Sequence, residues 1–158
     1  MICEDIGDLM TQARAGSSWM GLDLGTKTIG VAVSDRLLSS ATPLHTIRRV
    51  KFSKDAEALL QIISDREIGA IILGLPRNMD GSEGPRCQST RAFVRNLARL
   101  TDLPIGYWDE RLSTVAAERA LLEADTSRKR RAEVIDHVAA GYILQAALDR
   151  ARHIRTVT

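Results

Sequence analysis

The stretch WMGLDLGTKTIGVAVSD, from Trp19 to Asp35, decides the fold class of this chain. Two apolar runs, residues 19–24 and 28–34, are separated by a short polar segment that contains glycine, and larger and smaller residues alternate along the second run. This pattern predicts two strands that form an antiparallel hairpin. Asp23 lies inside the first strand, where a buried carboxylate is unfavourable by several kcal/mol unless it is paired or bound to a cation. We therefore expect Asp23 to have a function.

The remaining segments extend this hairpin into a mixed sheet. The expected strands lie near residues 44–49, at 70–75 and at 104–108, and the expected helices at 53–65, 86–100, 113–123 and 131–150. A three-stranded antiparallel meander followed by β-α-β units implies an α/β fold with a five-stranded mixed sheet flanked by helices. We predict one domain at residues 19–152, with residues 1–18 as an N-terminal extension and residues 153–158 as a C-terminal tail.

Composition and charge narrow the class of protein. The 158 residues suit one domain, and a hydrophobic fraction of 44% is enough for a core. No apolar run approaches the roughly 20 residues of a membrane span, and residues 1–5 do not resemble the start of a secretory signal. The two cysteines, Cys3 and Cys87, form neither a metal-binding pattern nor a disulfide framework. We expect a cytoplasmic protein without a membrane partner.

The acidic residues at three places suggest a shared site. Asp109 and Glu110 follow the last predicted strand, and Asp136 lies in the last helix, where Ala139 and Ala140 share its face and allow a close approach to the sheet. These acids can meet Asp23 if the last strand lies near the first.

Clustered carboxylates repel one another, and a hard divalent cation such as Mg²⁺ or Mn²⁺ relieves that repulsion. Two such ions, about 3.5–4 Å apart, promote phosphodiester cleavage in other enzymes. In this hypothesis Asp23 bridges the ions, while Glu110 binds one and Asp136 the other. The alternative is that Asp109 or Glu110 pairs with Arg111 or a helix N-terminus, and that Asp136 forms a surface ion pair.

Four motifs in order resemble the YqgF/RuvX family, which has a ribonuclease H-like fold. The motifs are Gly21–Gly30, Gly74–Pro76 with Asp80–Ser82, Asp109–Thr114 with Ala117 and Glu118, and Ile135–Ala140 with Ile143–Gln145. Only residues 1–18 lie outside the resemblance. By motif position, the resemblance implies that Asp23, Glu110 and Asp136 are the catalytic, metal-binding acids, with Asp109 as a further candidate ligand.

The resemblance also implies a metal-dependent nuclease that processes the 5′ end of pre-16S ribosomal RNA during ribosome biogenesis. The alternative within the family is a Holliday junction resolvase that cuts branched DNA. The expected partners are therefore structured RNA or branched DNA and the ribosome, and the chain would act as a monomer or a homodimer.

Basic residues near the predicted site are candidates for contacts with a nucleic-acid backbone. The net charge is only +2, but local clusters matter more than the total. The candidates are Lys27, Arg77, Arg86, Arg111, Lys129 and Arg130. Such contacts provide affinity without sequence readout. Arg111 has the alternative role of bracing Glu110, and the others have that of ordinary surface charge.

Two other classes of protein share features with this sequence. ATP-handling enzymes of the actin and sugar-kinase class share an Asp-x-Gly-Thr motif, but they need two such domains around a nucleotide, and 158 residues supply one. A non-catalytic RNA-binding module is the second rival, and the complete set of acids argues against it.

Overall fold

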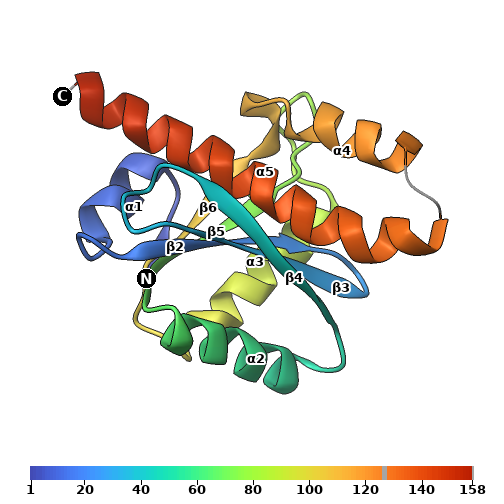
Figure 1. Cartoon of the computed structure of the whole chain (residues 1–158), viewed down its shortest axis with the longest axis horizontal. Coiled ribbons are helices and arrows are strands. Elements are labelled where there is room, and N and C mark those ends of the chain that lie inside the picture. The colour runs from blue at the N-terminus through green and yellow to red at the C-terminus, as the bar shows by residue number, and fades with distance from the viewer. Residues whose placement is uncertain (126–127, 158) are drawn as a thin grey trace.

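The computed structural model describes residues 1–125 and 128–157, and their side chains except at residues 123, 125, 128–136 and 157. Figure 1 shows the elements, which pack as a sheet between layers of helices. The strands are β1 (Ile2–Cys3), β2 (Ser18–Leu24), β3 (Thr28–Ser34), β4 (Ala41–Arg48), β5 (Ile68–Leu75) and β6 (Ile105–Asp109). The helices are α1 (Ile6–Gln12), α2 (Phe52–Asp65), α3 (Pro85–Leu97), the 3-10 turn η1 (Glu110–Leu112), α4 (Val115–Asp125) and α5 (Arg128–Val157).

The strands form one mixed sheet in the order β1-β6-β5-β2-β3-β4. The pairs β2–β3 and β3–β4 are antiparallel, which confirms the predicted meander, while β2–β5, β5–β6 and β1–β6 are parallel. The predicted fold class is therefore confirmed, with a correction to the strand number. The sixth strand, β1, has two residues, which is too short for an alternating pattern to be visible in the sequence.

Residues 1–18, which we expected to be an extension, form an edge of the sheet and part of the core. The N–H of Ile105 donates to the carbonyl of Met1 at 2.8 Å. Leu9 of α1 is fully buried, in the same hydrophobic cluster as Trp19 and Leu148. At the other end of the chain, α5 continues to Val157, so residues 153–157 of the expected tail are helical.

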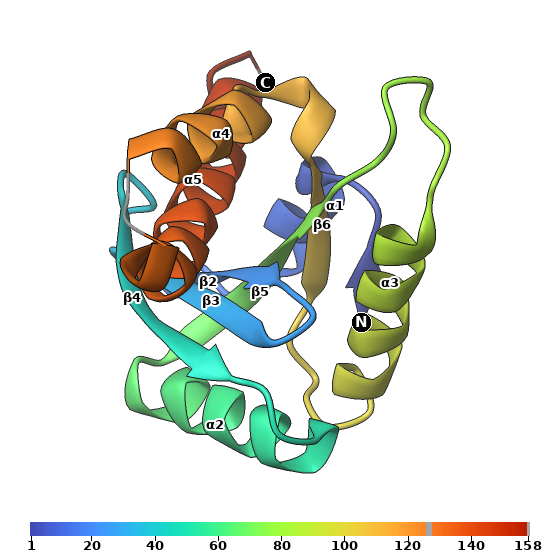
Figure 2. The ribbon, with the colours of Figure 1, turned by 90° about the vertical axis from the view of Figure 1, so that its right-hand side faces the viewer.

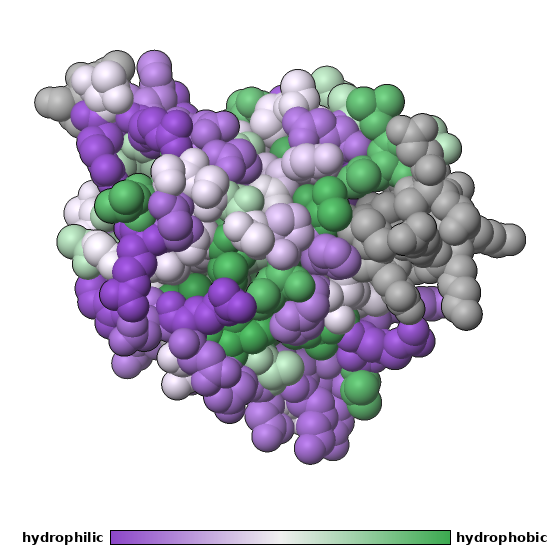
Figure 3. Space-filling view, in the orientation of Figure 1, coloured by the Kyte–Doolittle hydropathy of each residue, from purple (hydrophilic) through white to green (hydrophobic). Residues whose placement is uncertain are grey.

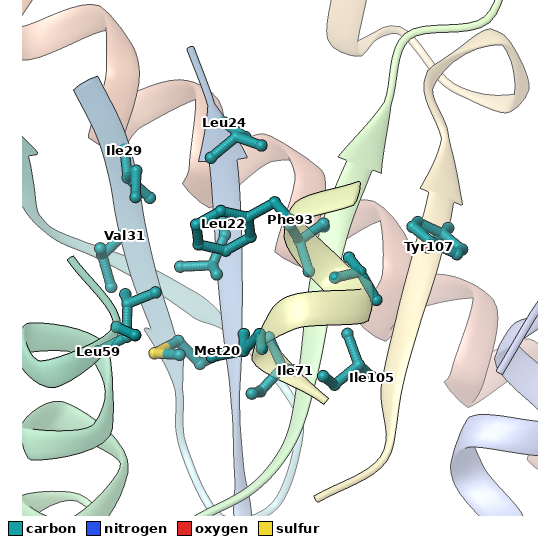
Figure 4. Close-up of a cluster of buried hydrophobic side chains, with 14 of the residues drawn as sticks. Met20, Leu22, Leu24, Ile29, Val31, Leu59, Ile71, Phe93, Ile105 and Tyr107 are labelled. Atoms are coloured by element: carbon teal, nitrogen blue, oxygen red, sulfur yellow. The ribbon is translucent and has the colours of Figure 1, made fainter. Parts of the chain in front are cut away.

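Helices cover both faces of the sheet (Figure 2). On one face, α2 and α3 pack on a cluster that includes Leu22, Leu24 and Phe93 (Figure 4). On the other face lie α1 and α5, with α4 beside α5. A Cβ atom added at Gly21 of β2 would lie 2.6 Å from Leu144 Cβ, so glycine is needed for α5 to approach the sheet this closely. Within the described part of the chain, no helix combines the length and apolar character of a membrane span.

Candidate active site

Two predicted acids, Asp23 and Glu110, lie at the same edge of the sheet. Asp23 is the sixth residue of β2, and Glu110 follows β6 directly. Both strands run parallel to β5, which separates them, so their carboxyl ends lie on one side. In open α/β sheets this is the edge at which ligands bind. Asp23 is 4% exposed and Glu110 is 7% exposed, so both carboxylates are withdrawn from solvent.

The direction of the Asp23 side chain follows from its strand. Leu22 and Leu24 point into the cluster under α2 and α3 (Figure 4), and successive side chains of a strand alternate between faces. Asp23 therefore points to the opposite face, toward α4 and α5. One-residue alternation thus places an acid on one face and two core leucines on the other.

Gly74 of β5 makes room for Glu110. The strand register pairs Gly74 with Trp108, and the next pair is Leu75 with Asp109. A Cβ atom added at Gly74 would lie 2.8 Å from Glu110 Oε2 and 2.5 Å from Ile143 Cδ1. Any larger residue would therefore displace the carboxylate or the α5 side chain. The family motif that contains Gly74 accordingly serves to seat an acid.

A guanidinium that the sequence reasoning missed joins the two acids. Arg119 of α4 donates from Nη1 to Asp23 Oδ2 at 2.9 Å and from Nη2 to Asp23 Oδ1 at 3.2 Å. The same Nη2 donates to Glu110 Oε1 at 3.1 Å. The one signal in the sequence was spacing, because Arg119 lies four residues after the apolar Val115 and so shares its helix face. The structure shows that Val115 is buried.

The electrostatics of this trio reflect burial and close charges. Burial raises the pKa of Glu110 above its ordinary value, the charge of Arg119 opposes this rise, and the charge of Asp23 adds to it. Burial lowers the pKa of Arg119, but the carboxylates of Asp23 and Glu110 outweigh that effect and the net shift is upward. The arginine is thus firmly charged, and it neutralises part of a carboxylate pair that would otherwise repel.

Asp109 belongs to a different set of contacts, although it is the next residue to Glu110. Arg111 donates to its carboxylate from Nη2 at 2.7 Å and from the backbone N–H at 3.0 Å, and Arg77 Nη1 lies 3.6 Å from Oδ2. The hydrogen bonds from Arg111 lower the pKa of Asp109 despite partial burial. Arg111 therefore braces Asp109 rather than Glu110.

Arg77 links this pair to a longer chain of charges. Arg77 Nη2 lies 3.2 Å from Glu83 Oε2, and Arg91 donates from Nε to Glu83 Oε1 at 2.6 Å. Arg91 also lies 3.1 Å from Glu4. The chain ties the loop after β5 to α3 and to the N-terminal segment, so the charges of Arg77 and Arg91 are largely engaged by acids.

The other basic candidates are more open to solvent. Lys27 is exposed on the turn between β2 and β3, and Arg86 is exposed in the first turn of α3. Arg86 borders a cavity of about 510 Å³, which is also lined by Gly25, Arg49 and Lys51. Arg49 is partly engaged there, because its Nη1 donates to the carbonyl of Gly25 at 2.6 Å. The cavity begins one residue beyond Asp23 on the α2 and α3 side of the sheet.

The side chains of Asp136, Lys129 and Arg130 lie outside the described residues. The α5 backbone runs through these positions, and the next residue, His137, contacts Thr46 of β4 through Nδ1 at 2.9 Å. Among the described side chains, no group of three histidines, cysteines or acids is arranged to hold a metal. Of the three predicted ligands, Asp23 and Glu110 are the two whose side chains the structure describes.

These two carboxylates suit a divalent cation. Asp23 comes from β2 and Glu110 from η1 directly after β6, and both are buried and converge on one positive group, Arg119. Carboxylate oxygens are the ligands that Mg²⁺ and Mn²⁺ prefer. Asp23 and Glu110 thus supply oxygen donors of the kind that the predicted metal centre needs.

The sheet order and the acids at its carboxyl edge define a ribonuclease H-like protein. Two solved structures of Thermus thermophilus RuvC share this fold, at TM-scores of 0.51 and 0.50 and 14% sequence identity. The match with a TM-score of 0.51 extends over 89% of this chain and 97% of the RuvC chain. The second, determined in complex with a Holliday junction substrate, covers 85% of this chain and 95% of its own.

The sequence comparisons identify the family. The model of the RuvX family, described as Holliday junction resolvase, matches residues 17–150. A relative from Ruegeria sp. (strain TM1040) is 71% identical, and the match covers 99% of both chains. A relative from Paracoccus denitrificans (strain Pd 1222) is 69% identical, with 98% of each chain covered. Both relatives are named "Putative pre-16S rRNA nuclease". The chain belongs to the RuvX family, which is a family of nucleases.

Proposed function

We propose that this protein is a divalent-metal-dependent endonuclease that hydrolyses phosphodiester bonds at the 5′ end of pre-16S ribosomal RNA. The observation that carries the proposal is the convergence of two buried carboxylates, Asp23 and Glu110, on one cation-binding position at the carboxyl edge of the sheet. The names of the relatives support the choice of RNA as the substrate.

In this proposal Asp23, Glu110 and Asp136 hold Mg²⁺ or Mn²⁺, with two ions as the working number. Bound ions supply Lewis-acid chemistry and an activated water to phosphodiester hydrolysis. The chain itself supplies orientation, because β2 fixes Asp23 and the absence of a side chain at Gly74 lets Glu110 lie over β5. Burial of both carboxylates keeps bulk water from competing for the donor oxygens.

Backbone phosphates of the substrate would be held by the basic side chains around the cavity beside Gly25. Lys51 and Arg86 are exposed there, and Lys27 projects from the adjacent turn. Contacts of this kind position a strand without reading its sequence. The nuclease would then select its cleavage site by the shape of a folded RNA, which is how many proteins recognise double-stranded RNA.

The test is cleavage of a pre-16S RNA fragment that contains the 5′ processing site, with Mg²⁺ or Mn²⁺ and then with a chelator. We expect wild-type protein to cut only with metal, and D23N and E110Q to lose cleavage by about 100-fold or more, because each removes a ligand charge. The matched control is D65N, which changes an exposed acid at the far end of α2 and should retain full activity. Cleavage that persists in D23N or with chelator contradicts the proposal.

A four-way DNA junction, assayed in parallel, tests the second candidate function. The family model and the fold shared with RuvC favour a Holliday junction resolvase. Junction resolution needs two active sites and hence a dimer. Cutting of the junction with the RNA left intact would assign the substrate to branched DNA. Equal RNA binding by wild type and D23N, with cleavage by neither, would instead indicate a non-catalytic RNA-binding module.

A further inference from the structure

We propose that Arg119 is an internal counter-cation that exchanges with the divalent metal, so that guanidinium and metal occupy the Asp23–Glu110 pair in turn. The inference rests on the proposed function, because it presumes that these acids bind metal. It adds a role for Arg119, which follows the motif residues Ala117 and Glu118 in α4 but is not itself one of the quoted motif residues.

Arg119 uses the carboxylate oxygens that a metal would need. Its two terminal nitrogens engage both oxygens of Asp23 and one oxygen of Glu110, at 2.9–3.2 Å. The second oxygen of Glu110 faces Gly74 of β5. A metal ligand distance is about 2.0–2.1 Å for Mg²⁺, so an ion bound by both acids would occupy the space of the guanidinium. Simultaneous occupancy would also place two cations in contact.

The two buried acids need a cation at all times. Their side chains are only 6% and 9% exposed, and both carboxylates lie against the same guanidinium. Two buried like charges without a partner are strongly unfavourable. Arg119 supplies that partner when metal is absent, and metal makes it dispensable.

Among its described side chains, α4 buries little apolar surface, so the helix can release Arg119. Val115 is the buried member among the described side chains of α4, and Leu121 is 66% exposed. Figure 3 shows hydrophobic residues at the surface around α4, at the upper right of the view. The helix packs mainly against α5, with η1 beside it. An element with so little buried apolar surface opens at low cost.

The experiment measures Mn²⁺ affinity by calorimetry and thermal stability without metal, for wild type, R119Q, R119K and R86Q. We expect R119Q to melt at a lower temperature without metal but to bind Mn²⁺ about tenfold more tightly, because it has no guanidinium to displace. Mn²⁺ should therefore raise its melting temperature more than that of wild type. R119K retains the charge but loses the two-pronged contact, so its affinity should lie between the two.

R86Q tests whether the loss of any nearby positive charge, without the loss of a contact to the two acids, changes Mn²⁺ affinity. Arg86 is exposed, and its charge acts on Glu110 from a distance. Its removal should change Mn²⁺ affinity by less than about twofold, since charges exposed to solvent are screened. An equal effect of R86Q and R119Q would overturn the exchange.

The remaining outcomes distinguish the exchange from the nuclease function. Unchanged or weaker Mn²⁺ affinity in R119Q, together with metal-dependent RNA cleavage by wild type, overturns the exchange and leaves the function intact. If no protein binds Mn²⁺, the exchange is overturned, and the function is decided by the cleavage assay alone. If R119Q does not fold, R119K decides, because affinity equal to that of wild type overturns the exchange.

Discussion

At the scale of single residues, the site depends on the missing side chain at Gly74 as well as on its acids. Glu110 lies over Gly74, where a Cβ atom would come within 2.8 Å of its carboxylate. The acid is placed by a strand end, and its direction is set by the missing side chain of the neighbouring strand. The glycine is therefore part of the catalytic arrangement in this proposal, although it carries no reactive group.

We predict that G74A lowers both activity and stability. The added methyl group must displace Glu110 or Ile143, and overpacking of this kind costs about 1–3 kcal/mol in the free energy of unfolding. RNA cleavage should fall more than stability alone explains, because the carboxylate moves. Urea unfolding and cleavage rates measure the two effects. G84A is the control, since its Cβ would meet only Asn78 Nδ2, at 3.9 Å; equal losses in both variants would contradict the prediction.

Asp35 gives a prediction for acid unfolding. The hydroxyl of Ser39 and the N–H of Ser40 donate to its carboxylate and lower its pKa from 3.8 to about 2. Because the folded-state pKa is lowered, the unfolded chain binds the proton more readily, and the stabilisation is present above about pH 4 and is lost as pH falls toward 2. The side chain of Asn in D35N does not titrate. The difference in unfolding free energy between wild type and D35N should therefore shrink as the pH falls through this range. Chemical denaturation of both proteins between pH 5 and about pH 2 measures the difference in unfolding free energy. A difference that stays constant over this range would refute the assignment.

At the scale of elements, α1 is the clearest departure from the sequence prediction. We expected residues 1–18 to extend from the domain, yet Leu9 is fully buried beside Gly106 of β6. We predict that L9A costs about 2–5 kcal/mol in the free energy of unfolding, as large-to-small changes in a core do. T11A, on the exposed side of the same helix, is the control and should cost less than about 1 kcal/mol. Equal urea midpoints for wild type and L9A would show that α1 is not part of the core.

Features that produce a pattern among neighbouring residues could be predicted from the sequence. They are the meander, the buried strand β5 and the positions of Asp23 and Glu110. An acid in an apolar strand is such a pattern, and so is an acid directly after a strand. Arg119 gave almost no such signal, because an arginine in an alanine-rich helix has the pattern of a solvated face. Its role depends on where α4 lies relative to β2, which is a tertiary contact 96 residues apart in sequence. The two residues of β1 also show no strand pattern in the sequence, since their pairing with β6 is visible only in the folded sheet.

At the scale of the whole molecule, the end of β2 divides two kinds of surface. Asp23 faces α4 with the acids, while Leu24 and Gly25 border the basic cavity between α2 and α3. A nucleic-acid strand that uses both must cross the carboxyl edge of the sheet. With a net charge of only +2, the molecule has little long-range attraction for a polyanion, and recognition in this proposal depends on local contacts.

The two edges of the sheet determine how copies of this protein can meet. One edge, β1, is two residues long, and the other, β4, contains Pro43 and a register shift opposite Val31 and Ala32. A short strand, a proline and a bulge are features that stop strands of separate molecules from pairing. Aggregation by continuous β-sheet is therefore disfavoured at both edges. Association of two chains would instead have to use helices and loops.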